Sequence, residues 1–244
     1  WIIEAVVEQI EIKRQLVVRV DGARRPGSIV ASNTSGIPIA ALAEGRSDDF
    51  RRHWLGTHFF NPPRYLHLIE IIPTAETSKT AVDQMSWFAD HRLGKGVVVA
   101  KDTPNFIGNR IGLFGVMGIL RALESGEFTI EEIDALTGPA LGRPKSATFR
   151  TMDIAGIDVM AHVARNLTER LTDPESLRAF ALPSVVTKLI ERGWVGEKSG
   201  QGFYKKVGND ILTLDPATLE YRPRKSARIP PLDVESSERD GSSE

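Results

Sequence analysis

The chain has 244 residues, of which 41% are hydrophobic and 26% charged, so it can bury an ordinary core in one large or two small domains. Its net charge of −1 and the lack of a basic stripe interleaved with aromatic residues argue against nucleic acid as a partner. The absence of cysteine excludes disulfides, thiolate metal sites and a cysteine nucleophile, and it favours a reducing, cytoplasmic location.

The first hundred residues alternate short apolar runs with segments of helical character. Strands are expected at residues 1–7, 28–31, 55–60, 66–72 and 96–100, and helices at 8–20, 37–44 and 77–93. Such alternation with short connections predicts a parallel or mostly parallel sheet. In sheets of this kind ligands bind beyond the carboxyl ends of the strands, so we expect the functional side chains at that edge.

From residue 101 the pattern becomes helical. Thr103 is a plausible cap for a long helix over residues 104–124, in which Gly108, Gly112 and Gly115 share one face. Each glycine costs roughly 1 kcal/mol of helix propensity relative to alanine. Close packing of this face against another backbone would compensate for that cost, and a merely kinked helix is the alternative.

Further helices are expected after the capping box at residues 129–132, at 157–171 and at 183–192. Past Tyr204 the pattern fades, and the chain from about residue 221 is proline-rich and basic, then acidic and serine-rich. We therefore expect a linker or disordered tail over residues 209–244. The longest apolar stretch, residues 106–120, contains an asparagine and an arginine and is too short to span a membrane.

The chain begins at Trp1 directly inside an apolar run, without a methionine, turn or cap. Natural domains rarely begin inside a strand. We therefore expect the sequence to be a fragment whose upstream part is missing.

A histidine and a glutamate lie on neighbouring predicted strands. His58 belongs to the motif Gly-Thr-His-Phe-Phe-Asn-Pro at residues 56–62, and Glu70 lies in the alternating strand that follows. A carboxylate on one imidazole nitrogen fixes the tautomer, so the other nitrogen can take a hydroxyl proton as hydride leaves the carbon. The pattern therefore favours hydroxyl oxidation with His58 as base and Glu70 as its partner. A hydrogen-bonded histidine packed beside aromatic residues is the alternative.

Five motifs together resemble the L-3-hydroxyacyl-CoA dehydrogenase family in order and spacing over roughly residues 1–205. They are Ser-Asn-Thr-Ser at 32–35, His-Phe-Phe-Asn-Pro at 58–62, the glutamate at 70, Lys-Asp-Thr-Pro-x-Phe-x-x-Asn-Arg at 101–110 and Lys-x-Gly-x-Gly-Phe-Tyr at 198–204. The resemblance implies an α/β Rossmann-like domain that binds NAD, here residues 1–101 with the amino-terminal part missing. It implies an all-α domain at residues 102–208, and oxidation of (3S)-3-hydroxyacyl-CoA to 3-oxoacyl-CoA with NAD in fatty-acid β-oxidation.

The resemblance also implies roles for the candidate catalytic residues. His58 would be the base, Glu70 its partner, and Ser35 and Asn109 would hydrogen-bond the substrate oxygens near the reacting carbon. Without the resemblance, Ser35 is an ordinary turn residue, and Asn109 is a cap or a hydrogen bond between helices. Gly36, which follows Ser35, departs from the family pattern.

For the cofactor, the resemblance assigns Glu8 and Lys13 to the ribose and pyrophosphate side of NAD, Ser35 and Asn61 to the nicotinamide side, and Lys198 to a late loop that reaches the nucleotide. By pattern alone, Glu8 and Lys13 are surface charges on a solvated helix, and Lys198 is equally unspecific. The 244 residues contain no Gly-x-Gly-x-x-Gly turn, so NAD rather than NADP rests on the resemblance. We expect this chain alone to bind NAD weakly or not at all.

Residues 214–223 resemble the connection in long fused β-oxidation proteins. The implied partners are the acyl-CoA substrate and either a second copy in a homodimer, a second helical domain, or a fused enoyl-CoA hydratase. Two other interpretations stay open: an inactive truncated fragment that acts as a dimerising or scaffold module, and a dehydrogenase of a hydroxy acid or sugar acid. The five histidines show no metal-ligand spacing with carboxylates, so no metal is expected.

Overall fold

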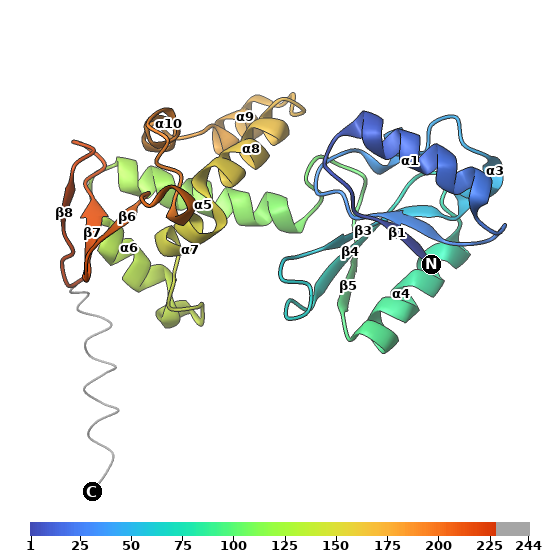
Figure 1. Cartoon of the computed structure of the whole chain (residues 1–244), viewed down its shortest axis with the longest axis horizontal. Helices are drawn as coiled ribbons and strands as arrows, with labels where there is room; N and C mark the ends of the chain where they lie inside the picture. Colours follow the sequence, from blue (N-terminus) through green and yellow to red (C-terminus); the bar gives the residue numbers. More distant parts are fainter. Residues whose placement is uncertain (228–244) are drawn as a thin grey trace, which may run out of the picture. The chain divides into compact units, whose positions relative to one another are not determined.

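The computed structural model describes residues 1–227, which form two compact units that divide after Gly112 (Figure 1). The first unit is Trp1–Gly112, and the second starts at Leu113. The final, serine-rich part of the expected tail lies outside the described residues. None of the described helices combines the length and apolar character needed to cross a membrane.

A five-stranded sheet in the order β1-β2-β3-β4-β5 organises the first unit. Its strands are β1 (Ile2–Glu4), β2 (Val30–Ser32), β3 (Trp54–Phe59), β4 (Leu68–Pro73) and β5 (Gly96–Val99). Its helices are α1 (Ile10–Ala23), α2 (Ile39–Leu42), α3 (Asp48–Arg52) and α4 (Lys79–Leu93). All neighbouring strands pair in parallel except β3 and β4, which are antiparallel. The predicted Rossmann-like, mostly parallel sheet is confirmed, and α3 is an additional short helix.

Alternate residues of the strands supply two hydrophobic layers, one on each face of this sheet. Val30 and Trp54 pack in the layer that α1, α2 and α3 cover. The next residues along the same strands, Ala31 and Leu55, pack with Met85 of α4 in the other layer. This division follows from the two-residue period of strand side chains. The sheet is therefore fixed from both sides.

Helix α5 (Gly108–Glu124) begins later than the sequence predicts. Asn105 and Phe106 adopt left-handed backbone conformations, with φ angles of 59° and 50°. Two such residues cannot continue a right-handed helix, and the conformation is costly for a bulky side chain such as phenylalanine. The prediction that Thr103 caps a helix over 104–124 is therefore wrong.

The glycines of α5 do not behave as one packed face. A Cβ atom added at Gly112 or Gly115 would meet no atom within 4 Å in the described part of the chain. At Gly108 it would lie 2.5 Å from Cζ of Phe60. Of these three glycines, only Gly108 is therefore required by close packing within residues 1–227, and its neighbour is a side chain rather than the expected backbone.

The second unit is helical, as predicted, and also contains a small sheet. Its helices are α6 (Ile130–Thr137), α7 (Phe149–Ala155), α8 (Ile157–Thr168), α9 (Pro174–Phe180) and α10 (Ser184–Glu191), with 3₁₀ turns η1 (Pro139–Leu141) and η2 (Glu197–Ser199). Thr129 and Glu132 form the predicted capping box of α6. The antiparallel sheet has the order β6-β7-β8, with β6 (Tyr204–Val207), β7 (Asp210–Leu214) and β8 (Tyr221–Pro223).

The expected linker or disordered tail from residue 209 is wrong over β7 and β8. Leu214 is fully buried in the hydrophobic core of the unit, and Tyr221 packs against that core. The β8 residue Arg222 also forms a partly buried ion pair with Glu131 of α6. These contacts hold β7 and β8 against the helical core, although their sequence has no strong periodicity.

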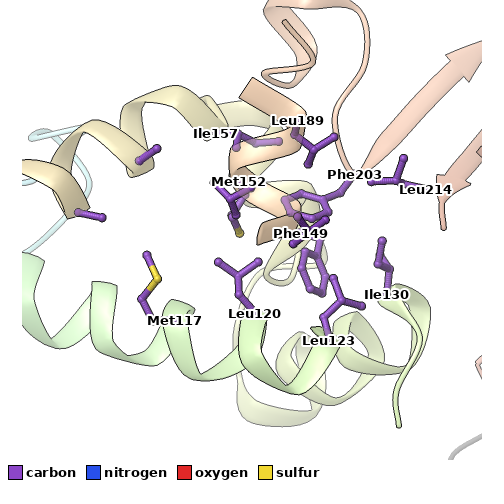
Figure 2. Close-up of a cluster of buried hydrophobic side chains, with 14 of the residues drawn as sticks. Met117, Leu120, Leu123, Ile130, Phe149, Met152, Ile157, Leu189, Phe203 and Leu214 are labelled. Carbon is purple, nitrogen blue, oxygen red and sulfur yellow. The ribbon is translucent and has the colours of Figure 1, made fainter. Parts of the chain in front are cut away.

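One cluster of buried side chains holds the second unit together (Figure 2). Met117, Leu120 and Leu123 project from one face of α5 into it, following the helical repeat. Across the cluster, the rings of Phe149 and Phe203 lie 4.7 Å apart between centroids. The helix α5 is thus anchored in the second unit through its carboxyl-terminal half.

Candidate active site

The central feature of the site is a histidine and a glutamate on paired strands. His58 of β3 and Glu70 of β4 stand directly opposite each other in the antiparallel register. Their side chains therefore share one face of the sheet. His58 Nδ1 lies 2.7 Å from Glu70 Oε2, and the two residues are 3% and 1% exposed. The predicted pairing of the two residues is present in the structure.

The second oxygen of the Glu70 carboxylate binds the start of α5. Oε1 accepts hydrogen bonds from the backbone N–H groups of Ile107 (2.9 Å) and Gly108 (2.7 Å). The helix amino terminus also carries a partial positive charge that favours a carboxylate. Burial alone raises the pKa of Glu70, but the hydrogen bonds from His58, Gly108 and Ile107 outweigh it and hold the pKa below its ordinary value. Glu70 is therefore ionised at neutral pH.

An ionised carboxylate can only accept hydrogen bonds, and this fixes the tautomer of His58. Since Glu70 Oε2 accepts, Nδ1 of the imidazole carries the hydrogen. In the neutral imidazole, Nε2 then holds a free electron pair. This is the arrangement that a general base requires.

Aromatic side chains surround the imidazole. The ring centroids of Phe60 and Phe106 lie 4.6 Å and 5.6 Å from that of His58. Phe106 takes this position through its left-handed backbone, and Phe60 fills the space that a side chain at Gly108 would need. Strained backbone of this kind is often found at functional sites. The apolar surroundings strengthen the bond between His58 and Glu70.

The turn after β2 is tied to the neighbouring strand ends. Asn33 Oδ1 accepts a hydrogen bond from Phe59 N (3.0 Å), which joins this turn to the residue after His58. Glu8 Oε1 accepts hydrogen bonds from the Thr34 hydroxyl and from Ser35 N. Ser35 itself is exposed. Ser35 was predicted as a functional residue of this turn. The hydrogen bond by which Asn33 holds the turn was not predicted.

A buried ion pair lies beneath this turn. Lys13 is 1% exposed, and its ammonium group contacts Glu4 Oε1 (2.8 Å), Glu8 Oε2 (3.3 Å) and the carbonyl of Val6 (3.0 Å). Glu4 is also buried and accepts a hydrogen bond from the Ser32 hydroxyl. The interpretation of Lys13 as a solvated surface charge is wrong, because all three ammonium donors have partners inside the chain.

Three further predicted residues expose polar groups in the first unit. Asn61 and Ser35 are exposed and Asn109 is half-buried. No hydrogen bond joins the side chains of these three residues to another residue in the range 1–227. Their hydroxyl and amide groups are therefore available to a ligand. Gly36, the departure noted above, has a physical reason: a Cβ atom there would lie 3.0 Å from Asn105 Oδ1.

Lys198 lies in the second unit, and its ammonium group pairs with Asp158 at 2.6 Å. The glycine-rich motif that carries it is anchored by Asp153, which is 1% exposed and accepts backbone N–H groups of Phe203 (2.9 Å) and Tyr204 (2.8 Å). A Cβ atom at Gly202 would overlap this carboxylate. Burial raises the pKa of Asp153 to about 6. Close packing of the loop against Asp153 therefore explains why Gly202 is a glycine. A contact between Lys198 and the cofactor stays a prediction.

Comparison with protein families identifies the chain. Residues 1–103 match the family model "3-hydroxyacyl-CoA dehydrogenase, NAD binding domain", and residues 106–206 match "3-hydroxyacyl-CoA dehydrogenase, C-terminal domain". A Mycobacterium tuberculosis protein named 3-hydroxybutyryl-CoA dehydrogenase is 33% identical over 204 residues, which are 83% of this chain and 69% of that protein. The chain belongs to the 3-hydroxyacyl-CoA dehydrogenase family.

Two further relatives place the chain within this family. A Bacillus subtilis protein named "Probable 3-hydroxyacyl-CoA dehydrogenase" is 52% identical over 234 residues, 96% of this chain. The chain spans only 30% of the length of that protein. The crystal structure of (S)-3-hydroxybutyryl-CoA dehydrogenase from Ralstonia eutropha superposes with a TM-score of 0.73 at 30% identity, and covers 82% of this chain and 68% of that one. The 3-hydroxyacyl-CoA dehydrogenase fold predicted from the motifs is confirmed.

Proposed function

We propose that the protein, at its natural length, oxidises (3S)-3-hydroxyacyl-CoA to 3-oxoacyl-CoA with NAD as a cytoplasmic step of fatty-acid β-oxidation. The observation that carries this proposal is the buried 2.7 Å contact between His58 Nδ1 and Glu70 Oε2. In the neutral imidazole this contact leaves Nε2 to act as the base. Membership of the 3-hydroxyacyl-CoA dehydrogenase family supplies the substrate class.

In this reaction the chain's own residues move and stabilise charge. His58 Nε2 takes the proton of the substrate hydroxyl while hydride leaves the carbon that bears this hydroxyl. Glu70 stabilises the resulting imidazolium. When bound, NAD supplies the acceptor for that hydride. Ser35 and Asn109 donate hydrogen bonds to substrate oxygens near the reacting carbon without competing for the proton.

The residues present suit one side of the cofactor. The Glu8 carboxylate has a 43% exposed side chain and can accept hydrogen bonds from ribose hydroxyls, and exposed Ser35 and Asn61 can contact the nicotinamide. Lys13 is better placed to hold Glu8 than to touch the cofactor, because its three donors are already used. Lys198 is proposed to reach the nucleotide from its loop. The sequence contains no glycine-rich turn for the pyrophosphate.

We also propose a homodimer. The amino-terminal half of α5 exposes Ile111 (68%) and Phe114 (56%) beside open glycines. An apolar helix face of this kind suits burial against another helix. A second copy, a further helical domain or a fused enoyl-CoA hydratase could each cover it, and we favour the second copy because the face is continuous along one helix.

A stereochemical assay tests the proposed activity. The natural-length protein is mixed with NAD and either (3S)- or (3R)-3-hydroxybutyryl-CoA, and NADH is followed by absorbance. We expect NADH only from the (3S) substrate, and little from NADP. If neither enantiomer is oxidised while NAD still binds, the proposal fails and the non-catalytic dimerising or scaffold role is favoured.

A further inference from the structure

A pocket of about 620 Å³ lies in the second unit among α6, α7, the β6–β7 pair and the segment after β8. Its wall includes four cationic side chains, those of Lys145, Arg150, Arg224 and Lys225. No residue of the candidate active site lines it. What the pocket can bind depends on which of its charges are already neutralised within the chain.

One carboxylate in the wall, Glu131, is fully used by neighbouring donors. Arg222 binds it with two parallel hydrogen bonds of 2.7 Å and 2.8 Å, and the backbone N–H of Lys225 adds a third at 2.9 Å. Burial alone raises the pKa of Glu131, but these donors lower it to about 2. Glu131 is therefore a charged but neutralised partner of Arg222, and it anchors the segment that carries Arg224 and Lys225.

The other carboxylate in the wall, Asp134, is also satisfied. It accepts the backbone N–H groups of Thr148 (3.0 Å) and Phe149 (2.8 Å) and the hydroxyl of Tyr204 (2.7 Å). Burial raises the pKa of Asp134. These donors are neutral, and within residues 1–227 no ion pair joins Asp134 to a cation of the pocket.

Within residues 1–227, three of the four cations have no carboxylate partner. Arg150 pairs with Glu197. Within residues 1–227 no ion pair joins Lys145, Arg224 or Lys225 to an acidic side chain, and the Arg224 guanidinium lies 5.6 Å from the centre of the Tyr204 ring instead. The pocket therefore carries an excess of positive charge that the described residues leave uncompensated.

We propose that this pocket binds the diphosphate group of a nucleotide-sized organic ligand. Lys145, Lys225 and the forked guanidinium of Arg224 provide the donors that phosphate oxygens accept. The volume is that of a small-molecule site, and Pro139 and Ile211 give it an apolar wall for the uncharged part of the ligand. The proposal does not depend on the dehydrogenase activity, because the two sites share no residue.

Calorimetric titration of the intact protein tests this proposal, with ADP, pyrophosphate and adenosine as probes. ADP can also occupy the proposed NAD site, so only the part of its binding that Lys145→Ala and Lys225→Ala remove is assigned to the pocket. We expect ADP to bind and adenosine to bind at least tenfold more weakly. Lys145→Ala and Lys225→Ala should each weaken ADP binding about three- to tenfold, since each removes one charge-assisted contact. Lys188→Ala is the matched control, because Lys188 is an exposed lysine of α10 in the same unit that does not line the pocket.

The outcomes separate a built site from general attraction between charges. If ADP binds more tightly than pyrophosphate, the ligand is a nucleotide. If the two bind equally, the ligand is a free diphosphate. Either result supports an anion site in this pocket. Absence of ADP binding at millimolar concentration overturns the proposal. So does an equal loss for Lys188→Ala, because that result indicates nonspecific electrostatics. Unchanged melting temperatures confirm that the variants are folded.

Discussion

At the scale of single residues, the chemistry of the site depends on Glu70. One carboxylate oxygen of Glu70 accepts a hydrogen bond from the imidazole of His58. The other oxygen accepts hydrogen bonds from the backbone N–H groups of Ile107 and Gly108. The three donors hold the charge on Glu70 and, through it, the tautomer of His58. The same side chain thus orients the imidazole of the proposed base and binds the amino terminus of α5.

Replacing Glu70 by glutamine separates these two roles. The amide oxygen of Glu70→Gln can still accept the N–H groups of α5, but its NH₂ group then faces His58 Nδ1, which must accept. Nε2 consequently carries the hydrogen and cannot act as a base. We expect turnover to fall by about 10²–10⁴ with the fold retained, as measured by steady-state kinetics and circular dichroism. Glu127→Gln, an exposed change in the other unit, is the control.

The same variant has a signature in the pH dependence of stability. The pKa of Glu70 is lower in the folded protein than in the unfolded chain. The ionised carboxylate therefore stabilises the fold at pH values above the unfolded pKa, and this stabilisation is lost as the pH falls through the folded pKa. The melting temperature of Glu70→Gln should therefore lie below that of the unsubstituted protein at pH 7, and the difference should shrink below about pH 4.5. A constant difference across this range would mean that Glu70 is not stabilised as an anion.

The residues of the site were predictable from sequence to different degrees. The pairing of His58 with Glu70 could be predicted because strand alternation fixes which side chains share a face. The burial of Lys13 could not, since it depends on a buried carboxylate, Glu4, supplied by a separate strand. The left-handed backbone at Phe106 was equally hidden, because a phenylalanine gives no local signal for that conformation.

At the scale of elements, α5 begins beside Glu70 and continues into the helical unit, and two of its glycines, Gly108 and Gly112, are packed differently. Gly108 lies beside Phe60, the ring that packs on His58, whereas a Cβ atom added at Gly112 would meet no atom within 4 Å in residues 1–227. The two glycines occupy the same helix and would undergo the same chemical change on substitution by alanine. They therefore form a matched pair.

Alanine substitutions at these two positions should have opposite effects. Gly108→Ala forces a Cβ atom against Phe60 and should lower the free energy of unfolding by about 1–3 kcal/mol while impairing catalysis. Gly112→Ala meets no neighbour and gains helix propensity, so it should raise that free energy by up to about 1 kcal/mol. Chemical denaturation measures both. Equal destabilisation by the two changes would contradict the packing described here.

Among the elements, long periodic segments were predictable and short ones were not. The sheet and the capping box at Thr129 followed from alternation and from a local motif. The strands β7 and β8 did not, because their place is set by contacts with distant residues, such as Arg222 with Glu131. Short segments of this kind owe their structure to tertiary contacts rather than to propensity.

At the scale of the whole molecule, the exposed α5 face predicts association of two copies. Gly112→Leu introduces a large side chain into this face and should convert a dimer to a monomer, whereas Gly112→Ala should leave the dimer intact. Light scattering gives the mass of both variants and of the unsubstituted protein. A monomeric unsubstituted protein, or a Leu variant that stays dimeric, would rule out this surface as the interface.

The most direct test of the account is His58→Gln in the natural-length protein. The proposed base acts on the reacting proton, so turnover of (3S)-3-hydroxybutyryl-CoA should fall by about 10²–10⁴. Calorimetry should show NAD affinity changed by less than about twofold, because the proposed base is not needed to hold the cofactor. His91→Gln, an exposed histidine of α4, should match the unsubstituted protein in both measurements. If His58→Gln turned over the substrate at the unsubstituted rate, the assignment of His58 and Glu70 as the catalytic pair would be wrong.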